Sequence, residues 1–417
     1  MPNKLGTVLV PLLLLSGLSL AIPAVAYSPP AASPNWVLAQ SALTPTCSPS
    51  GLCPSMMLNA YNVAALQSAG IKGTGQTIIL VDACNDPTIA SDLATFDSQF
   101  GLPNPTLNVI YPQTTTSCSK LLQHEWDVEI SLDVEWSHVM APTATIDLLL
   151  AKTQSTTNLI GAWTYALTNN LGNQISNSWG SSGACSSSES SALKTANTDH
   201  VTILASAGDK EAWGSGTSQP VQNPADCGTV LTVGGTTLTV DSSGDYLSES
   251  AWGPACVGGT GTGGGYVTGV TEPGYQTAVK INDPSNLLGK PDVSADADPC
   301  TGVWVYDSQT SGLAGWPTAW GVVGGTSLSC PLWAGFLADV NQIRASNSFS
   351  PAGTLQPFLY RGVYGVSGTG AAYAKDFHDV TTGSNGLPAG AGWDPDTGLG
   401  SFNAFNLANT LGTQSSA

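Results

Sequence analysis

A serine in the setting expected of a nucleophile stands in the segment Gly324-Gly-Thr-Ser327-Leu-Ser-Cys-Pro331. Two glycines permit a tight turn, and Ser327 then falls at the start of a helix predicted over 327–342. A hydroxyl in that position lies beside free backbone N–H groups, whose dipoles favour negative charge. Acyl transfer through a serine needs such donors, because an oxyanion forms next to the nucleophile. A simple helix cap is the alternative interpretation.

Two acids with helical spacing could supply the base for this serine. Glu129 and Asp133 are four residues apart, so they share one face of the helix predicted over 125–137. Their mutual repulsion eases if they share protons, which raises one apparent pKa of the pair. The alternative is a solvated acidic face, but apolar Ile130 and Leu132 flank the stripe in a chain with few charges.

Two further acidic segments could contribute to chemistry or to metal binding. Asp209 ends Ala205-Ser-Ala-Gly-Asp209 and is either a turn residue or a protonated acid that donates to an oxyanion. Near the end of the chain, Asp379 and Asp394 lie in Gly-rich loops whose oxygen atoms suit a hard cation such as Ca²⁺. An ordinary glycine-rich loop is the alternative for this last segment.

Strand-like and helix-like segments alternate around these residues, which predicts a parallel sheet covered on both faces. Functional sites in such folds gather where strand ends meet helix starts. Strands are predicted at 77–82, 145–151, 174–179, 201–205 and 229–233, and helices at 88–100, 125–137, 158–168, 187–199 and 327–342.

The charge balance excludes one class of partner. The 417 residues include 29 acidic side chains against 11 Lys and Arg, giving a net charge of −18 at pH 7, which argues against nucleic acid as a partner. In strong acid the carboxylates are neutral, and at most the 11 basic residues and four histidines repel one another. The composition suits an acidic habitat and an ordinary acidic extracellular protein equally well.

The first 26 residues have the pattern of a secretory signal peptide, with an apolar run over 8–22 and an Ala-Val-Ala cleavage site. A retained anchor is the alternative, but the run is short for a spanning helix. Residues 27–46, rich in Pro, Ala and Ser, are predicted as a short flexible lead-in, and residues 47–414 as one domain. We expect a secreted, extracellular protein without a membrane anchor in its mature form.

Nine cysteines are compatible with disulfide bonds in an exported protein. Cys47 and Cys53 are close in sequence and are predicted to pair. The odd count leaves at least one free thiol, for which we select Cys330 in its apolar helix start. The absence of a CxxC motif or a Cys/His cluster argues against zinc.

Taken together and in order, these motifs resemble one family, the sedolisins or serine-carboxyl peptidases, relatives of subtilisin. Any single motif is weak, whereas the ordered set is highly specific and favours the catalytic interpretations over the alternatives above. The resemblance covers roughly residues 47–414 and rests on the segments 79–83, 86–87, 91–103, 129–133, 141–144 (APTA), 176–180 (SNSWG), 206–209 (SAGD), 291–297 (PDVSADA), 325–331 and 379–394.

The resemblance implies a role for each matching residue. It makes Ser327 the nucleophile, Glu129 its base and Asp133 the residue that orients Glu129, and it implies an oxyanion hole from Asp209 and the Ser327 N–H. It implies substrate contacts along the 176–180 strand and the 263–266 segment, with Ser178, Trp179, Gly180, Gly264 and Gly265 as the residues selected. It implies one Ca²⁺ ion, held by the side chains of Asp379 and Asp394 and the carbonyls of Val380, Gly390 and Gly392.

The implied fold is α/β and subtilisin-like, with a seven-stranded, mostly parallel sheet flanked by helices. The implied function is a serine-type endopeptidase that hydrolyses unfolded or extended polypeptides in acid, and we expect a monomer. Glutamate is largely ionised near pH ~4, where an unperturbed histidine (pKa ~6.5) is protonated and cannot act as a base. A tripeptidyl exopeptidase of the same family and a non-catalytic binding protein on the same fold stay open as alternatives.

Ordinary subtilisin chemistry is the rival within the fold. It would use Asp82 and a histidine in a His-Gly-Thr context shortly after it, and none of the four histidines has that context. Asp82 is therefore expected to be structural or to support the catalytic acids. Sedolisins usually carry a long pro-segment, whereas about twenty residues separate the predicted signal peptide from the predicted domain here, which leaves the control of activity open.

Overall fold

The structure is a computed structural model that describes residues 30–114, 118–210, 221–281, 285–311, 316, 318–368 and 370–414. The predicted signal peptide, residues 1–26, lies outside the described residues. Among the described helices, none is long and apolar enough to cross a membrane.

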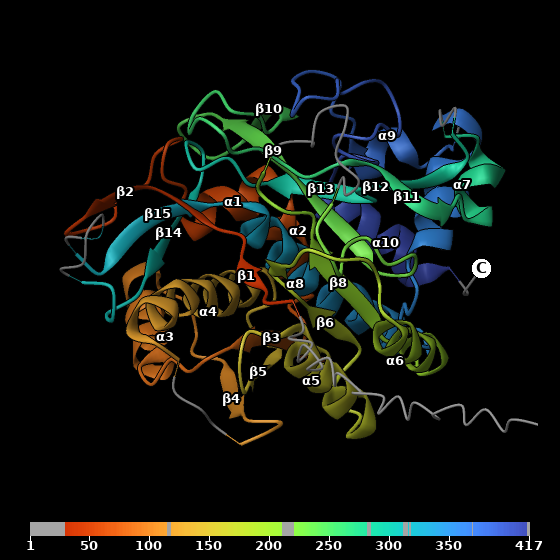
Figure 1. The fold of residues 1–417 in the computed structure, drawn as a ribbon. Coiled ribbons are helices and arrows are strands. Elements are labelled where there is room, and N and C mark those ends of the chain that lie inside the picture. Colours follow the sequence, from red (N-terminus) through yellow and green to blue (C-terminus); the bar gives the residue numbers. More distant parts are fainter. Residues whose placement is uncertain are drawn as a thin grey trace, which may run out of the picture.

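A central sheet organises the molecule (Figure 1). Within the described residues its seven parallel strands lie side by side in the order β4, β5, β3, β6, β8, β9 and β13, and β10 pairs antiparallel with β9. The predicted mostly parallel sheet is therefore confirmed; it has the seven parallel strands expected and an eighth, antiparallel strand. The strand bounds are β3 Thr77–Ala83, β4 Thr106–Ile110, β5 Thr145–Ala151, β6 Gln174–Ser176, β8 Thr202–Ser206, β9 Leu231–Val240, β10 Tyr246–Ala251 and β13 Val293–Asp296.

Helices cover both faces of this sheet, and the sequence of β3 explains why. Successive side chains of a strand point to opposite faces. Accordingly, Ile78 and Leu80 belong to one hydrophobic core, whereas Ile79 and Val81 belong to another. The first core also takes in side chains of α3 (Ile89–Phe100), α4 (Lys120–Met140), α8 (Thr326–Ser346) and α10 (Ala404–Thr413). The second takes in α5 (Thr156–Thr168) and α6 (Ser187–Thr198), which lie together in Figure 1.

The predicted element types are correct, and the differences lie at the ends. Helix α4 begins at Lys120 rather than 125, because Ser119 caps it by accepting the N–H of Leu122 at 3.4 Å. The strand predicted over 174–179 is interrupted after Ser176, and a second short strand, β7, follows at Trp179–Gly180. This interruption lies next to the start of α8, where the candidate nucleophile stands.

Residues 30–46 differ most from the prediction. They were expected to be a flexible lead-in, but β1 (Ser33–Pro34) pairs antiparallel with β7, and β2 (Val37–Ala42) pairs antiparallel with β15 (Trp320–Gly324). Strand β15 leads directly into α8 and also pairs with β14 (Val303–Tyr306). The expectation of flexibility is therefore wrong for residues 33–42, because their backbone groups bond to strands far away in the sequence.

Smaller elements complete the structure around this core. They are the helices α1 (Pro54–Ala60), α2 (Val63–Ser68), α7 (Gly274–Val279) and α9 (Tyr373–Asp376), the wide helical turn η1 (Phe358–Tyr364), the tight turn η2 (Val366–Gly368), and the strands β11 (Gly265–Thr271), β12 (Leu287–Lys290), β16 (Phe377–His378) and β17 (Ser401–Phe402).

The predicted disulfide between Cys47 and Cys53 is present, and Cys330 is a buried free thiol, as predicted. Three further disulfides join Cys84 to Cys118, Cys185 to Cys227 and Cys256 to Cys300. The spacing of these six cysteines did not specify their partners.

Candidate active site

The junction between β15 and α8 places Ser327 in the first turn of a long helix. Gly325 makes the junction with φ at +113°, a conformation that favours glycine. An added Cβ at this position would collide with the carbonyl oxygen of Asn35 and with Asp209 Oδ2. The glycine thus lets two chemically important oxygen atoms lie close to the helix start.

The hydroxyl of Ser327 meets the carboxylate of Glu129. Ser327 Oγ lies 2.9 Å from Glu129 Oε2 and 2.8 Å from the carbonyl oxygen of Ser178, so its single proton has two acceptors. Both Ser327 and Glu129 are 0% exposed. The structure therefore brings together, from α8 and α4, the nucleophile and the base that the sequence suggested, and the alternative of a solvated acidic face is wrong for Glu129 and Asp133.

Glu129 belongs to a group of three buried acids, with Asp133 and Asp82, that has no neighbouring cation in the described part of the chain. Asp133 is fully buried one turn after Glu129, and its Oδ1 accepts a hydrogen bond from Ser178 Oγ at 2.6 Å. Asp82, at the end of β3, is also buried, and neither of its oxygen atoms has a hydrogen-bond partner among the described residues. None of the ion pairs found in the described part of the chain involves these three acids.

Burial and repulsion favour protonated forms in this group. Burial, followed by the nearby charges of Asp133 and Asp82, raises the pKa of Glu129 well above its ordinary value. Burial and then Asp82 likewise raise the pKa of Asp133, and burial raises that of Asp82 to about 8. A protein interior without a cation resists several negative charges in one place. Repulsion among the three acids therefore favours forms of this group in which they share protons.

Asp209 lies on the other side of the helix start. Its Oδ1 accepts hydrogen bonds from the N–H of Thr326 at 2.8 Å and from Thr326 Oγ1 at 2.7 Å. Its Oδ2 is buried and has no partner among the described residues. Burial raises the pKa of Asp209 to about 7, so in acid the carboxyl group carries a proton. A protonated Oδ2 beside the Ser327 backbone has the chemistry of an oxyanion-hole donor.

Residues 33–36 of the same chain lie over Ser327. The Ser327 N–H donates to the carbonyl oxygen of Asn35 at 3.0 Å, and the Asn35 N–H lies 3.1 Å from Ser327 Oγ and 3.3 Å from the carbonyl oxygen of Ser178. Ser33 and Pro34 pair with Gly180 and Trp179. In Figure 1, β1 lies at the centre of the view, near α4 and β6.

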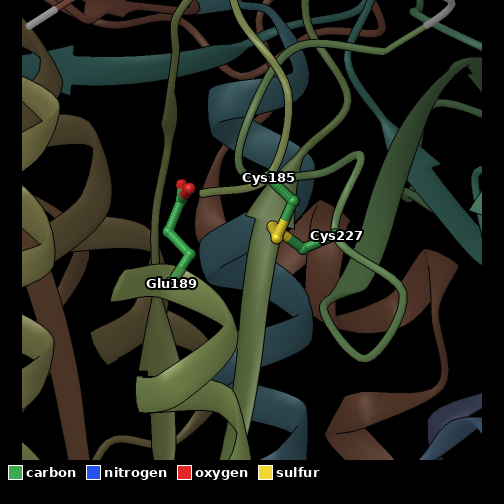
Figure 2. A group of neighbouring side chains, drawn as sticks. All are labelled: Cys185, Glu189 and Cys227. Atoms are coloured by element: carbon green, nitrogen blue, oxygen red, sulfur yellow. A yellow bond between two sulfur atoms is a disulfide. The ribbon is translucent and has the colours of Figure 1, made fainter. Parts of the chain in front are cut away.

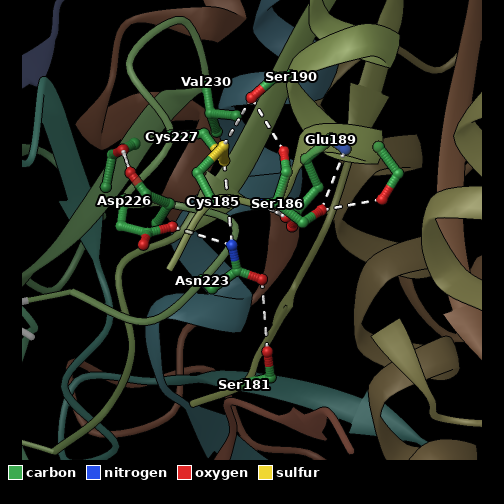
Figure 3. Close-up of a disulfide and its surroundings, with 12 residues drawn as sticks. Ser181, Cys185, Ser186, Glu189, Ser190, Asn223, Asp226, Cys227 and Val230 are labelled. Atoms are coloured by element: carbon green, nitrogen blue, oxygen red, sulfur yellow. Dashed lines mark hydrogen bonds between the residues drawn. A yellow bond between two sulfur atoms is a disulfide. The ribbon is translucent and has the colours of Figure 1, made fainter. Parts of the chain in front are cut away.

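Residues 178–180 form a wall against which residues 33–35 lie. Of the predicted substrate-binding residues, Ser178, Trp179 and Gly180 contact residues 33–35 through their backbone. The wall continues through Ser181, whose N–H donates to the Asn223 carbonyl at 2.9 Å. Figure 3 shows how the loop bearing Asn223 is attached: its side chain bonds to Asp226, and the adjoining Cys227 is cross-linked to Cys185. The disulfide thus anchors the loop that supports this wall.

The other predicted substrate residues, Gly264 and Gly265, follow Gly263 in the chain, and Gly264 lies against Pro395. The Gly263 N–H donates to the Gly208 carbonyl at 2.8 Å, and Gly265 pairs with Lys290 between β11 and β12. Within the described residues, no hydrogen bond joins Gly264 or Gly265 to residues 33–36. Their role as substrate contacts stays a prediction.

The predicted calcium ligands lie in two loops that are joined by hydrogen bonds from backbone N–H groups to carboxylates. Asp379 accepts the N–H of Gly392 at 3.0 Å, and Asp394 accepts the N–H of Gly390 at 3.3 Å. Burial, and after it the charges of Asp379 and Asp394, raise the pKa of Tyr364, so both carboxylates lie near this tyrosine. The ion pairs of the described residues leave both without a lysine or arginine partner. Two carboxylates with loop carbonyls are a donor set that fits Ca²⁺.

Two other groups of potential metal ligands are explained by disulfides. Figure 2 shows Glu189 near Cys185 and Cys227, whose sulfur atoms are bonded to each other and therefore offer no thiolate. Glu189 instead accepts the Ser186 N–H in the capping box of α6. The group of Cys256, Asp298 and Cys300 likewise contains a disulfide.

Sequence reasoning missed the part of the site that residues 33–36 and Ser206 form. The Asn35 side chain donates to Ser206 Oγ at 3.0 Å, and the Trp36 indole donates to the Glu125 carbonyl at 2.9 Å. The only signal was that Ser206 precedes Asp209 in the Ser-Ala-Gly-Asp motif. Asp82 was expected to be structural or supporting, and the structure places it near Glu129 and Asp133.

Comparison with known proteins agrees with this geometry. A model of the subtilase family matches residues 131–366, more than half of the chain. Kumamolisin from Bacillus sp. (strain MN-32) is 29% identical over 393 residues, which cover 88% of this chain and 64% of kumamolisin. Human tripeptidyl-peptidase 1 is 31% identical over 237 residues, covering 51% of this chain and 37% of that protein. The chain thus spans less than two thirds of the length of these relatives.

A solved structure of Pseudomonas sedolisin, a serine-carboxyl proteinase in complex with pseudo-iodotyrostatin, has the same fold. It superposes with a TM-score of 0.71 at 25% sequence identity, covering 87% of this chain and 98% of the sedolisin chain. The family model, the relatives and the carboxylate-rich site lead to one conclusion: the chain belongs to the subtilase family and, within it, to the sedolisins, the serine-carboxyl peptidases.

Proposed function

We propose that this protein hydrolyses peptide bonds in acidic solution through Ser327, Glu129 and Asp133. The observation that carries the proposal is the 2.9 Å contact between Ser327 Oγ and Glu129 Oε2 inside a buried group of acids. No histidine takes part, because His124, His138, His200 and His378 make no hydrogen bond or ion pair with Ser327 among the described residues.

Each step of acyl transfer has a residue in place. Ser327 Oγ attacks the carbonyl carbon of the substrate while Glu129 takes the hydroxyl proton. The oxyanion is stabilised by the Ser327 N–H and by the protonated Asp209. Glu129 then gives its proton to the departing amine. In the second half of the reaction, water attacks the acyl-enzyme while Glu129 takes a proton from it, and Glu129 returns that proton to Ser327 Oγ as the acid product leaves. Asp133, held by Ser178 Oγ, fixes the position of Glu129.

The acidic working range follows from Asp209. Its pKa of about 7 means that the donor proton is lost as the pH rises through neutrality. Activity should therefore fall above about pH 7 even though Glu129 is then a better base. An Asn at position 209 would donate at any pH, so Asp209→Asn should extend activity to higher pH.

Residues 30–35 lie over Ser327 as an extended substrate would, and their contacts support endopeptidase action over removal of terminal tripeptides. On the amino-terminal side of Asn35, at least the residues back to Pro30 stay in contact with the protein: the Ala32 N–H donates to the Gln154 carbonyl at 2.8 Å, and the Thr156 N–H donates to the Pro30 carbonyl at 3.1 Å. A tripeptidyl exopeptidase would need the cleft closed after three residues. Unfolded or extended polypeptides, cut internally by a monomer, are the substrates we propose.

Two further features belong to the same proposal. We place the protein outside the cell, because of the signal-like first 26 residues. We also assign one Ca²⁺ ion to Asp379, Asp394 and the carbonyls of Val380, Gly390 and Gly392, where it would stabilise the loops without taking part in the chemistry.

A digestion assay tests the activity. Purified protein is mixed with an unfolded protein at about pH 4, and Ser327→Ala is compared with Ser329→Ala. Ser329 lies in the same turn and its hydroxyl donates to the Thr326 carbonyl at 3.0 Å, so it is a matched control. We expect Ser329→Ala to digest the substrate and Ser327→Ala to leave it intact. Equal activity of wild type and Ser327→Ala would refute the proposal.

A further inference from the structure

A cavity of about 300 Å³ lies beyond the end of the wall that residues 178–180 form. It is lined by the amino-terminal ends of α5 and α6, which lie together in Figure 1, and by the loop over 182–184 that follows β7. None of the catalytic residues lines it. A polypeptide that lies along the wall therefore passes this cavity at a distance from Ser327.

Glu189 gives the cavity an acid with unused bonding capacity. The side chain lines the cavity and is 2% exposed. Its Oε2 accepts the Ser186 N–H in the capping box of α6, whose other hydrogen bond is drawn in Figure 3, whereas its Oε1 has no hydrogen-bond partner among the described residues. None of the ion pairs in the described part of the chain involves Glu189. The helix cap thus uses one carboxylate oxygen and leaves the other for a ligand.

The charges around the cavity favour a cation as this ligand. Glu189 lies in the first turn of α6, where the helix dipole stabilises a negative charge. A second acid, Asp226, is close by: burial raises its pKa to about 6, and the charge of Glu189 contributes to that rise. Serine and threonine residues make up much of the remaining lining, so an ammonium or guanidinium group would find further oxygen acceptors.

Pro30 shows which part of an extended chain borders the cavity. Its carbonyl accepts the Thr156 N–H at 3.1 Å, and its ring faces Gly183, where an added Cβ would lie 3.8 Å from Pro30 Cγ. Pro30 itself lines the cavity, which stays open beside its short ring. It is five residues before Asn35, whose carbonyl accepts the Ser327 N–H. A longer side chain at the position of Pro30 would therefore enter the cavity.

We propose that this cavity is a binding site for a basic side chain of the substrate, and that Glu189 makes the enzyme select lysine or arginine five residues before the residue whose carbonyl is attacked. The inference rests on the proposed peptidase function and adds a substrate class to it. Glu189 would bind the substrate through Oε1, far from the reacting atoms, so its effect is on selection and not on the chemical steps.

Substrate selection is tested with amino-terminally acetylated fluorogenic peptides, whose cut position is checked by mass spectrometry. The assay is run at about pH 5, where an unperturbed glutamate (pKa ~4.3) is largely ionised. The peptides differ only at the residue five positions before the one that is cut, which is lysine, glutamine or glutamate. We expect kcat/KM to be about tenfold higher for lysine than for glutamine, the size of one charge-assisted hydrogen bond, and lowest for glutamate.

Glu189→Gln removes the charge and keeps the helix cap, because the amide oxygen still accepts the Ser186 N–H. In this variant the lysine and glutamine peptides should be cut at similar rates. Asp199→Asn, at the exposed far end of α6, is the control and should keep the wild-type preference. Equal rates for both peptides with wild type, a preference for the glutamate peptide, or an unchanged preference in Glu189→Gln would overturn the inference. In each of these cases the peptides are still cut, so the proposed function stands.

A second measurement needs no peptidase activity. In the Ser327→Ala background, Pro30→Lys is compared with Pro30→Gln by thermal unfolding at about pH 5. Lysine should give a melting temperature about 1–2 °C higher than glutamine, and the difference should vanish when Glu189→Gln is added. Equal melting temperatures with Glu189 in place would overturn the inference. An enzyme that cuts neither the peptides nor an unfolded protein would remove the proposed function, and this comparison would still decide whether the cavity binds a cation.

Discussion

Buried carboxylates at two places in this molecule have opposite surroundings. Asp82, Glu129 and Asp133 lie together without a cation, and at least one oxygen atom of each has no hydrogen-bond partner among the described residues. Asp292 is equally buried, but Lys290 Nζ lies 2.6 Å from its Oδ2, and the Thr232 N–H and the Tyr360 hydroxyl also donate to it. The three acids of the first site keep oxygen atoms free to exchange protons. The oxygen atoms of Asp292, in contrast, are bonded to donors of the surrounding structure.

The difference indicates where burial serves reactivity and where it serves stability. A buried acid without partners favours its protonated form, and its proton is available to a neighbour. A buried acid with a lysine and two further donors is fixed, and removing one partner leaves an uncompensated charge. Substitutions in the two groups should therefore affect different properties, activity in one and folding in the other.

The largest expected effect is on catalysis. Glu129→Gln should lower kcat/KM by about 10⁴-fold or more, because the amide cannot accept the Ser327 proton. The melting temperature should stay the same or rise, since a buried acid is replaced by a neutral group of the same shape. Glu125→Gln, one turn earlier on α4 and exposed, is the control and should keep near wild-type activity. A Glu129→Gln enzyme with wild-type activity would break the comparison.

The second effect is on stability. Lys290→Met should lower the free energy of unfolding by about 3–5 kcal/mol, because it leaves Asp292 buried without its cation. Urea unfolding measures this change, and kcat/KM of the folded protein should be unchanged. The double variant with Asp292→Leu should recover most of the lost stability. If the single variant is as stable as wild type, the pair does not have the structural role assigned here.

The third effect is a dependence of stability on pH. A carboxyl group whose pKa is raised in the folded state binds its proton more tightly there, so its contribution is complete below the unfolded pKa near 4 and is lost as the pH rises. The pKa of about 8 for Asp82 and of about 7 for Asp209 place this loss between about pH 4 and pH 8. We expect the melting temperature to fall by about 5 °C over this range. Asp82→Asn should flatten the profile, whereas the exposed Asp245→Asn should not.

The smallest effect concerns two further acids, whose surroundings are intermediate between those of the catalytic acids and those of Asp292. Asp379 and Asp394 accept backbone N–H groups but have no lysine or arginine partner in the described ion pairs. If Ca²⁺ supplies the missing charge, chelation should lower the melting temperature by a few degrees, and the difference should disappear in Asp394→Asn. An unchanged melting curve on chelation would remove calcium from this account.

Much of the catalytic arrangement could be predicted because its signals are local. The spacing of Glu129 and Asp133 fixes them on one helix face, and the glycines before Ser327 mark a turn into a helix. The apolar runs of β3 and β5, separated by helical segments, likewise indicated a parallel sheet, and the short loop between Cys47 and Cys53 indicated that disulfide.

The remainder depends on pairing between distant segments, which has no local signal. Residues 33–42 carry Pro, Ala and Ser and show no clear alternation, so their order comes from β7 and β15 rather than from their own sequence. The position of Asp82 beside Glu129 likewise follows from packing of β3 against α4. The partners of six cysteines depend on the same long-range folding.

The most direct test of the central claim is to trap the acyl group. A short peptide ester is mixed with the purified enzyme at about pH 4 and the reaction is quenched in strong acid. The protein is then digested and analysed by mass spectrometry. We predict that the acyl group is found on Ser327 and is absent in Glu129→Gln. An acyl group on another residue, or one that forms equally well without the Glu129 carboxylate, would contradict the account.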